Sequence, residues 1–204
     1  MTDAAMTAGT AAGTAAGTAA GASTMAATLA FGAVDTPLGR VLVGATEAGV
    51  AWFAFGDGPA ERARATAALR LPLVADDERL APTLEQVAAY FTGARTEFDL
   101  PIDWRLTSRV QRQVLETLYG TVGYGKVVTY GELGDRSGAQ VPAQAIGQVM
   151  GSNPIPLIVP CHRVVASNGL GGYSGGSGVE VKRWLLTLEG SLPATLDWDP
   201  ERGP

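Results

Sequence analysis

Short apolar runs alternate with turn residues in the first part of the chain. Three of these runs predict strands over residues 28–34, 40–44 and 50–55. Residues 35–39 and 47–49 contain proline, glycine and acidic side chains, which are typical of turns. We therefore expect an antiparallel meander of three strands.

Two segments after the strands have apolar residues at helical spacing. They predict helices over residues 60–69 and 83–91. The acidic residues 76–78 are expected to lie in a loop before the second helix. Residues 99–104 contain a proline and are expected to link this unit to a second one.

The second half of the chain begins with helical patterns. Ser108 can cap a helix that runs to about residue 118. Thr129 and Glu132 have capping-box spacing at the start of a short helix to about residue 136. Residues 142–150, which start with proline, predict another helix. Two short helices around a glycine-containing turn suggest a helix-turn-helix, and an ordinary helical hairpin remains the alternative.

The apolar run at residues 155–159 predicts a buried strand that leads to Cys161 and His162. A glycine-rich segment, residues 169–178, follows them. A rigid strand that presents a thiol beside a loop of small residues is a suitable way to expose a nucleophile. The alternative is that the cysteine is a small buried apolar side chain.

The ends of the chain differ in composition from its middle. Residues 1–27 are almost entirely Ala, Gly, Thr and Ser, which predicts disorder and does not match a signal peptide. No apolar stretch approaches the length of a membrane span. We expect a first domain over residues 28–102, a second over 103–190, and a solvated acidic tail over 191–204.

The overall charge does not resemble that of a dedicated DNA-binding protein. Fifteen basic side chains face twenty acidic ones, giving a net charge of −5. Residues 105–183, however, contain eight basic and four acidic side chains. Because phosphates respond to the local face of a protein, this stretch can still bind nucleic acid.

The chain has one cysteine and one histidine, and they are adjacent. This excludes an internal disulfide and a zinc site made only of Cys and His ligands. A nucleophilic thiol needs a base, but neighbours on a strand point to opposite sides, so a bridging water is expected between Cys161 and His162. A carboxylate would fix the histidine tautomer. Glu180 and Glu189 are both candidates.

Three stretches resemble the 6-O-alkylguanine-DNA alkyltransferase family, also called methylated-DNA–protein-cysteine methyltransferases. The most specific is Pro160-Cys161-His162-Arg163 within residues 153–165. Residues 124–133 and 172–190 also fit the family. The resemblance is strong over about residues 111–190 and looser back to about residue 29.

This resemblance implies an α+β fold. A small ribonuclease H-like α/β domain would precede a helical, winged-helix-like domain with a DNA-binding helix-turn-helix. The implied reaction is a stoichiometric, single-turnover transfer of an alkyl group from 6-O-alkylguanine to Cys161. The helix-turn-helix would enter the minor groove, and the base would be flipped out of the duplex. The implied partner is double-stranded DNA carrying alkylated guanine. A monomer in the cytoplasm, on the nucleoid when bound to DNA, is expected, without cofactor, metal or membrane.

The resemblance also assigns roles to residues. Cys161 matches the alkyl acceptor, His162 the water-mediated base, and Glu189 the carboxylate that orients it. Asn153 matches a hinge residue, and Tyr130 a tyrosine that helps to rotate the nucleotide. The positions implied to contact the base are Val164, Tyr173 and Ser174. The positions implied to contact DNA are Tyr130, Ala143, Gln144 and Arg163.

Two positions depart from the family pattern. Gln144 stands where the family has an arginine that takes the place of the flipped base, so weaker flipping or weaker DNA binding is expected. Leu115 stands where many members have tryptophan. Gln144 and the acidic balance keep open a second function, a lesion-binding protein without catalysis. A Cys-His hydrolase is a third, poorer alternative, because it would need an oxyanion hole and turnover.

Overall fold

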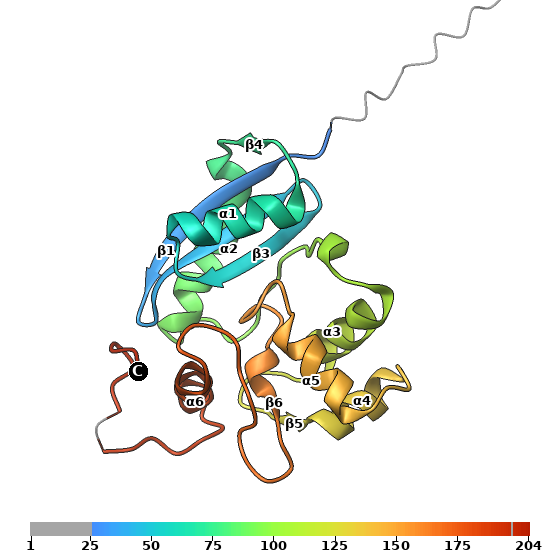
Figure 1. Ribbon diagram of the computed structural model, residues 1–204. Coiled ribbons are helices and arrows are strands. Elements are labelled where there is room, and N and C mark those ends of the chain that lie inside the picture. The colour runs from blue at the N-terminus through green and yellow to red at the C-terminus, as the bar shows by residue number, and fades with distance from the viewer. Residues whose placement is uncertain (1–25, 197) are drawn as a thin grey trace, which may run out of the picture.

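The computed structural model describes residues 26–196 and 198–204. The disorder expected for residues 1–27 therefore lies outside the described residues, apart from the last two. Figure 1 shows a unit built on a sheet at one end of the molecule and a helical unit at the other. One apolar core runs through both, with buried side chains such as Val43 and Phe53 from the sheet and Leu118 and Leu185 from the helices.

The sheet unit contains the expected meander. Strands β1 (Leu29–Thr36), β2 (Gly39–Thr46) and β3 (Gly49–Phe55) pair antiparallel in sequence order. The short strand β4 (Leu73–Val74) adds to β1 in parallel, which gives the order β3-β2-β1-β4. The meander prediction is confirmed, whereas β4 was not predicted because two residues carry no periodic signal.

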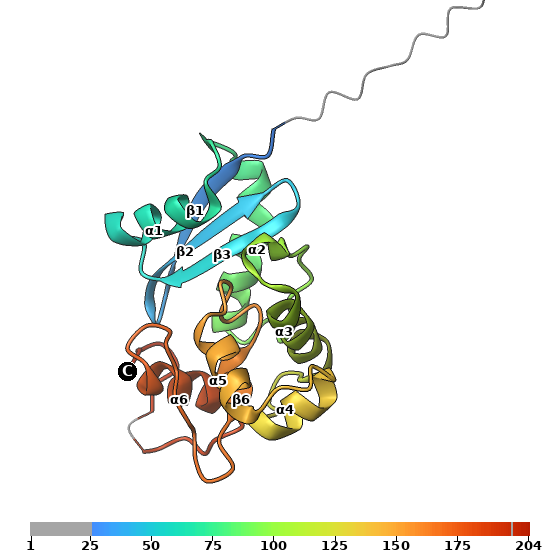
Figure 2. The same ribbon diagram turned by 45° about the vertical axis from the view of Figure 1, so that its right-hand side comes forward.

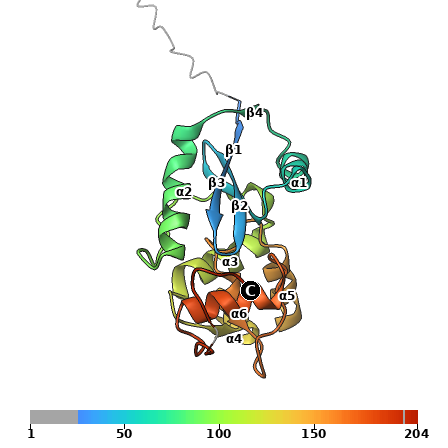
Figure 3. The same ribbon diagram turned by 90° about the vertical axis from the view of Figure 1, so that its left-hand side faces the viewer.

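Two helices cover the sheet. Helix α1 (Pro59–Leu69) lies on one side and α2 (Asp77–Phe91) on the other, as Figure 3 shows with the sheet seen nearly edge-on. Helix α2 begins six residues earlier than predicted. The Asp76 side chain accepts a hydrogen bond from the Arg79 backbone N–H at 3.0 Å and so caps the helix. The acidic residues 76–78 therefore form a helix start, not a loop.

The expected linker is fastened to the sheet. The Val50 N–H donates to the Pro101 carbonyl at 2.9 Å, and the Asp103 N–H donates to the Val50 carbonyl at 2.9 Å. A β-carbon at Gly49 would lie 2.2 Å from the Pro101 carbonyl oxygen, so this approach requires glycine. Because the segment lies along the edge of β3, it fixes where the second unit begins. A 3₁₀ turn, η1 (Trp104–Leu106), follows.

The helical unit begins with α3 (Arg109–Thr121), which Ser108 and Gln111 cap with a capping box. Helices α4 (Tyr130–Ser137) and α5 (Ala143–Gly151) follow and pack together (Figure 2). The Thr129–Glu132 capping box at the start of α4 is present as predicted.

The turn between α4 and α5 suits close helix packing. Gly138 ends α4 with φ +62°, a left-handed conformation that glycine adopts without strain. A β-carbon at Gly134 would lie 3.4 Å from Ile146 on α5. The two helices form the helix-turn-helix arrangement that the sequence suggested.

The prediction of a strand over residues 155–159 is wrong. Leu157 has φ +72°, and the Val159 N–H donates to the Ile155 carbonyl at 3.0 Å, so the run is a buried turn. The sequence showed that these residues are apolar, but burial alone does not imply strand pairing. The nearby two-stranded sheet pairs β5 (Val128–Thr129) with β6 (Val164–Val165) in parallel.

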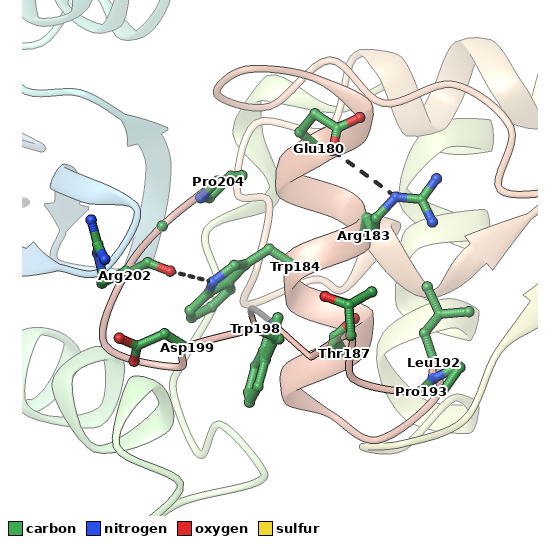
Figure 4. Close-up of a pocket in the computed structure, with 12 residues that line it drawn as sticks. Glu180, Arg183, Trp184, Thr187, Leu192, Pro193, Trp198, Asp199, Arg202 and Pro204 are labelled. Atoms are coloured by element: carbon green, nitrogen blue, oxygen red, sulfur yellow. Dashed lines mark hydrogen bonds and ion pairs between the residues drawn. The ribbon is translucent and has the colours of Figure 1, made fainter.

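The chain ends with helix α6 (Val179–Leu188) and a tail that packs on it. The Trp184 indole N–H donates to the Arg202 carbonyl at 2.8 Å, and the Trp198 ring lies 6.3 Å from that of Trp184 (Figure 4). Residues 199–204 are exposed, as expected for a solvated tail, whereas Trp198 is half-buried. Within the described residues, no helix has both the length and the apolar character needed to cross a membrane.

Candidate active site

Cys161 lies in a 3₁₀ turn, η2 (Cys161–Arg163), between the buried apolar turn and β6. Its backbone N–H donates to the Val159 carbonyl at 2.8 Å, and its side chain is almost fully buried. Cys161 and His162 therefore do not lie on a strand, contrary to the prediction. The His162 ring is hydrogen-bonded to Glu189.

A cavity of about 650 Å³ opens on Cys161. This volume lies within the range of sites for small ligands. The lining residues come from the starts of α4 and α5, the end of α5, and the glycine-rich loop before α6: Tyr130, Ala143, Gln144, Gly147, Met150, Gly151, Cys161, Gly172, Tyr173 and Ser174. The cavity thus joins the helix-turn-helix to the thiol.

The glycine-rich loop is attached to both helices. The Tyr130 hydroxyl donates to the Gly172 carbonyl at 3.3 Å, and the Ser174 hydroxyl donates to the Gly151 carbonyl at 3.2 Å. Gly171 has φ +70°, and a β-carbon there would lie 3.0 Å from the Tyr130 ring. The loop can therefore lie this close to Tyr130 only because this position is glycine.

Lys182 also binds the glycine-rich loop. Its ammonium group is buried and donates to the Val164 carbonyl at 2.6 Å and to the Gly172 carbonyl at 3.2 Å. It also lies 5.9 Å from the centre of the Tyr130 ring. Burial lowers the pKa of Lys182 to about 8, while the Cys161 thiolate would raise it. Lys182 was matched only as part of the family motif, and the reasoning from the sequence gave it no role.

Glu189 is the carboxylate that faces the histidine. Its Oε1 lies 2.9 Å from His162 Nε2, and Arg163 binds both of its oxygens. Burial raises the pKa of Glu189, but the hydrogen bonds and charges of His162 and Arg163 outweigh burial and lower this pKa to about 2. Glu180, the other candidate, is exposed and lies 4.0 Å from Arg183.

The expectation that Arg163 contacts DNA is wrong. Only 6% of this residue is exposed, and besides Glu189 it donates to the Val122 carbonyl at 2.7 Å. Its guanidinium is fully used inside the protein as the counter-charge of Glu189. The sequence could not reveal this, because Arg163 and Glu189 are 26 positions apart and meet only when α6 packs on η2.

His162 has one ring nitrogen available for chemistry. Glu189 accepts from Nε2, which places the proton of the neutral ring there, and Nδ1 is buried without a hydrogen-bond partner among the described residues. Burial lowers the pKa of His162, and Glu189 only partly offsets this effect. The ring is therefore neutral near pH 7, with Nδ1 as its acceptor.

The environment of the thiol contains opposing influences. Burial raises the pKa of Cys161, whereas Asn153, the charge of Lys182 and the Tyr173 hydroxyl favour the thiolate. Burial dominates, so the resting state is a thiol that needs a base when it reacts.

Asn153 connects the end of α5 to the turn before Cys161. Its amide donates to the Val159 carbonyl at 2.9 Å, and its side-chain oxygen accepts from the Ile155 N–H at 3.2 Å. These contacts place it where a hinge between the DNA-facing helix and the thiol would lie. The C-cap of α5 itself is Ser152.

Not all of the other assigned positions line the cavity. Ala143 and Gln144 are exposed in the first turn of α5 and line the cavity. The Tyr173 hydroxyl is buried beside Cys161, and burial raises its pKa well above the ordinary value. Val164 is fully buried outside the cavity lining, and its carbonyl accepts from Lys182.

Comparison with known proteins decides the family. The model for the 6-O-methylguanine DNA methyltransferase ribonuclease-like domain matches residues 29–104, and the model for the DNA-binding domain matches residues 109–191. The methylated-DNA–protein-cysteine methyltransferase of Sulfolobus acidocaldarius is 32% identical over 162 residues, which cover 79% of this chain and 94% of the relative. The chain belongs to the 6-O-methylguanine DNA methyltransferase family.

Other members of the 6-O-methylguanine DNA methyltransferase family agree in sequence and fold. The Mycobacterium tuberculosis protein is 47% identical over 115 residues, which cover 55% of this chain and 67% of the relative. The crystal structure of M. tuberculosis OGT in complex with DNA has a TM-score of 0.65 and 32% identity, and the match covers 79% of this chain and 93% of that one. The α+β fold with a ribonuclease-like and a DNA-binding domain is thereby confirmed.

Membership of the 6-O-methylguanine DNA methyltransferase family sets the class of activity. The chain is a methylated-DNA–protein-cysteine methyltransferase by class, and its reaction is the repair of alkylated DNA by methyl transfer to a protein cysteine. This confirms the resemblance inferred from the sequence and overturns the hydrolase alternative.

Proposed function

We propose that Cys161 removes the alkyl group from 6-O-alkylguanine in double-stranded DNA, once per protein molecule. The observation that carries this proposal is the position of Cys161, the only cysteine, in a cavity that the helix-turn-helix also lines and that has room for a flipped base. The buried His162–Glu189 pair beside it supplies a base of fixed tautomer.

The proton transfer follows from the two ring nitrogens of His162. Glu189 holds the Nε2 proton, so a water between Nδ1 and the thiol can pass the Cys161 proton to Nδ1. The sulfur then attacks the alkyl carbon, a C–S bond forms, and the C–O bond breaks with its electron pair left on guanine. Guanine gains a proton in place of the alkyl group. The thioether has no good leaving group, so the protein is not regenerated.

The DNA side of the proposal rests on α4 and α5. We infer that α5 enters the minor groove and that the damaged base is flipped into the cavity, where Tyr130 and Tyr173 contact it. The M. tuberculosis OGT structure with DNA supports a DNA-bound mode for this fold. We further propose that the protein acts as a monomer in the reducing cytoplasm, where the thiol stays free.

Intact-protein mass spectrometry tests the function directly. After mixing with duplex DNA that contains 6-O-methylguanine, the protein is expected to gain the mass of one methyl group and no more. The Cys161→Ala variant, mixed with the same duplex, is expected to gain none. A second added methyl group, or methylation of the alanine variant, would place the acceptor elsewhere.

A second candidate function is lesion recognition without transfer. It is favoured by Gln144, which has no fixed positive charge, and by the net charge of −5. In this case the mass would stay unchanged while the protein still bound the damaged duplex more tightly than an undamaged one.

The effect of Gln144 can be predicted. Gln144→Arg is expected to tighten binding to the lesion duplex about five- to tenfold, because a charge-assisted contact replaces a neutral one at the mouth of the cavity. The slope of affinity against salt concentration should also become steeper. Fluorescence anisotropy with labelled duplex measures both quantities.

Gln148→Arg is the matched control. Gln148 is exposed on the same helix but lies outside the cavity lining. The variant therefore adds the same charge to α5 without placing it at the cavity. If both variants tighten binding equally, general charge and not the position of Gln144 explains the effect. Unchanged affinity and rate in Gln144→Arg would remove the proposed role of this residue.

A further inference from the structure

The sheet unit lines a second cavity that borders Cys161, with Phe53 and Phe55 among its lining residues, and one further side chain of this unit reaches the active-site carboxylate. Tyr90 lies near the end of α2 and is fully buried. Its hydroxyl donates to Glu189 Oε1 at 2.6 Å, across 99 positions of sequence. Figure 1 shows α2 reaching down from the sheet towards the helical unit.

We propose that Tyr90 is a positioning residue for alkyl transfer, which fixes the Glu189 oxygen that holds His162 and thereby sets how readily His162 takes up a proton. This proposal rests on the proposed function, since it concerns the same relay. It gives the first domain a direct hydrogen bond to the relay that activates Cys161.

The sharing of one oxygen carries the argument. Glu189 Oε1 accepts from Tyr90, from His162 Nε2 at 2.9 Å and from Arg163 at 2.8 Å. Each donor withdraws negative charge from the oxygen, so the Tyr90 bond weakens the attraction between Glu189 and the imidazolium form of His162. Oε2 is held separately, by Arg163 at 3.0 Å and by the Gly125 N–H at 3.4 Å.

The phenol of Tyr90 is held in a fixed orientation. Its ring stacks on Phe98 with centroids 5.4 Å apart, and meets Phe91 edge-on at 5.4 Å and Tyr124 at 6.0 Å. Tyr124 in turn donates to the Leu188 carbonyl, next to Glu189. Aromatic side chains packed in this way direct the hydroxyl at one place.

The charged groups that act on His162 come from η2 and from helix α6 with its C-cap. Glu189 and Lys182 belong to the α6 region, Arg163 follows His162 in η2, and Cys161 precedes it. Glu189 raises the pKa of His162, whereas burial, Arg163 and Lys182 lower it. Removal of the Tyr90 donor leaves all of these in place and makes the carboxylate a stronger partner for a protonated His162. The pKa of His162 should then rise.

Tyr90→Phe tests the proposal, because it keeps the ring packing and removes only the hydroxyl. His162 is the only histidine, so its NMR signals need no assignment. In the variant, its pKa is expected to rise by about half a unit to one unit, and the Nε2–H proton should move downfield at pH 7. The acid limb of the pH–rate profile should shift to higher pH by the same amount. The rate there falls about three- to tenfold, while the rate at pH 8 stays within about twofold.

Tyr119→Phe is the matched control. The Tyr119 hydroxyl donates to the Phe98 carbonyl at 2.6 Å and does not touch Glu189. This variant should leave the NMR signals of His162 and the pH profile unchanged. Circular dichroism establishes that both variants are folded.

Two outcomes would overturn the proposal. An unchanged His162 pKa with an unchanged Nε2–H signal in Tyr90→Phe would show that the hydroxyl does not influence the relay. A rate lowered equally at every pH would indicate a merely structural role. Failure of the proposed function is distinct from both, because the unaltered protein would then transfer no methyl group whatever its NMR signals show.

Discussion

Glu189→Gln is expected to lower the free energy of unfolding at pH 7 by about 3–5 kcal/mol. The variant keeps the size of the side chain but removes the negative charge that compensates Arg163. The Arg163 side chain is 8% exposed, so water cannot replace that charge. An uncompensated buried cation is among the most costly single changes in a folded protein.

Urea denaturation followed by circular dichroism measures this loss. A double variant, Glu189→Gln with Arg163→Met, provides the control. If the loss comes from the unpaired charge, the double variant should be more stable than the sum of the two single effects predicts. Additive effects would instead indicate that the two side chains contribute separately, through packing.

The same pair makes stability depend on pH in a defined window. The pKa of Glu189 is about 2 in the folded protein and about 4.3 in an unfolded chain. Because the folded pKa is the lower one, the contribution is complete above about pH 5 and is lost as the pH falls towards 2. The Glu189→Gln variant should lack this part of the acid destabilisation.

Methyl transfer should fall by about 100-fold or more in Glu189→Gln. A glutamine can present either its oxygen or its N–H to His162, so the proton is no longer held on Nε2 and the acceptor on Nδ1 is lost. The double variant with Arg163→Met should recover stability without recovering rate. Recovery of both together would show that the carboxylate acts only through folding.

The second large effect is expected for Lys182→Met, which should slow methyl transfer by about 10- to 100-fold. Two losses combine in this variant. The positive charge that favours the Cys161 thiolate disappears, and the carbonyls of Val164 and Gly172 lose a shared donor. The glycine-rich wall of the cavity then loses its anchor to β6.

The effect of Lys182 can be separated into its two parts. The rate of iodoacetamide alkylation against pH, followed by mass spectrometry, reports Cys161 alone, since the chain has one cysteine, and the pKa of the thiol should rise by about one unit. Lys126→Met removes the other lysine, which is exposed, and should change neither pKa nor rate. A thiol pKa that is the same in Lys182→Met as in the unaltered protein would contradict the electrostatic part of this account.

Local interactions explain what the sequence could predict. The capping boxes at Ser108 and Thr129 and the turns of the meander involve residues two to four positions apart, so their chemistry is visible in the sequence. Hydrophobic periodicity likewise located α1 and α3, but it missed the first six residues of α2. It failed over residues 155–159, because an apolar run shows that a segment is buried and not how its backbone is paired.

Contacts between residues far apart in the chain explain what the sequence could not predict. From the residues alone, Glu180 and Glu189 were equivalent partners for His162, and only the packing of α6 against η2 separates a buried carboxylate from an exposed one. Arg163 was assigned to DNA only through the family resemblance. Its place inside the protein depends on Glu189 being there to compensate it.

The sequence by itself determined the nucleophile, its neighbouring histidine, the order of the domains' elements and the family. Only the tertiary structure determined which groups control that nucleophile: Tyr90 from α2, Lys182 beneath the loop, and Arg163 beside Glu189. The physical reason is that side-chain type and spacing define local chemistry. The pKa of a buried group depends instead on the charges and donors that folding brings within hydrogen-bond distance, whatever their separation along the chain.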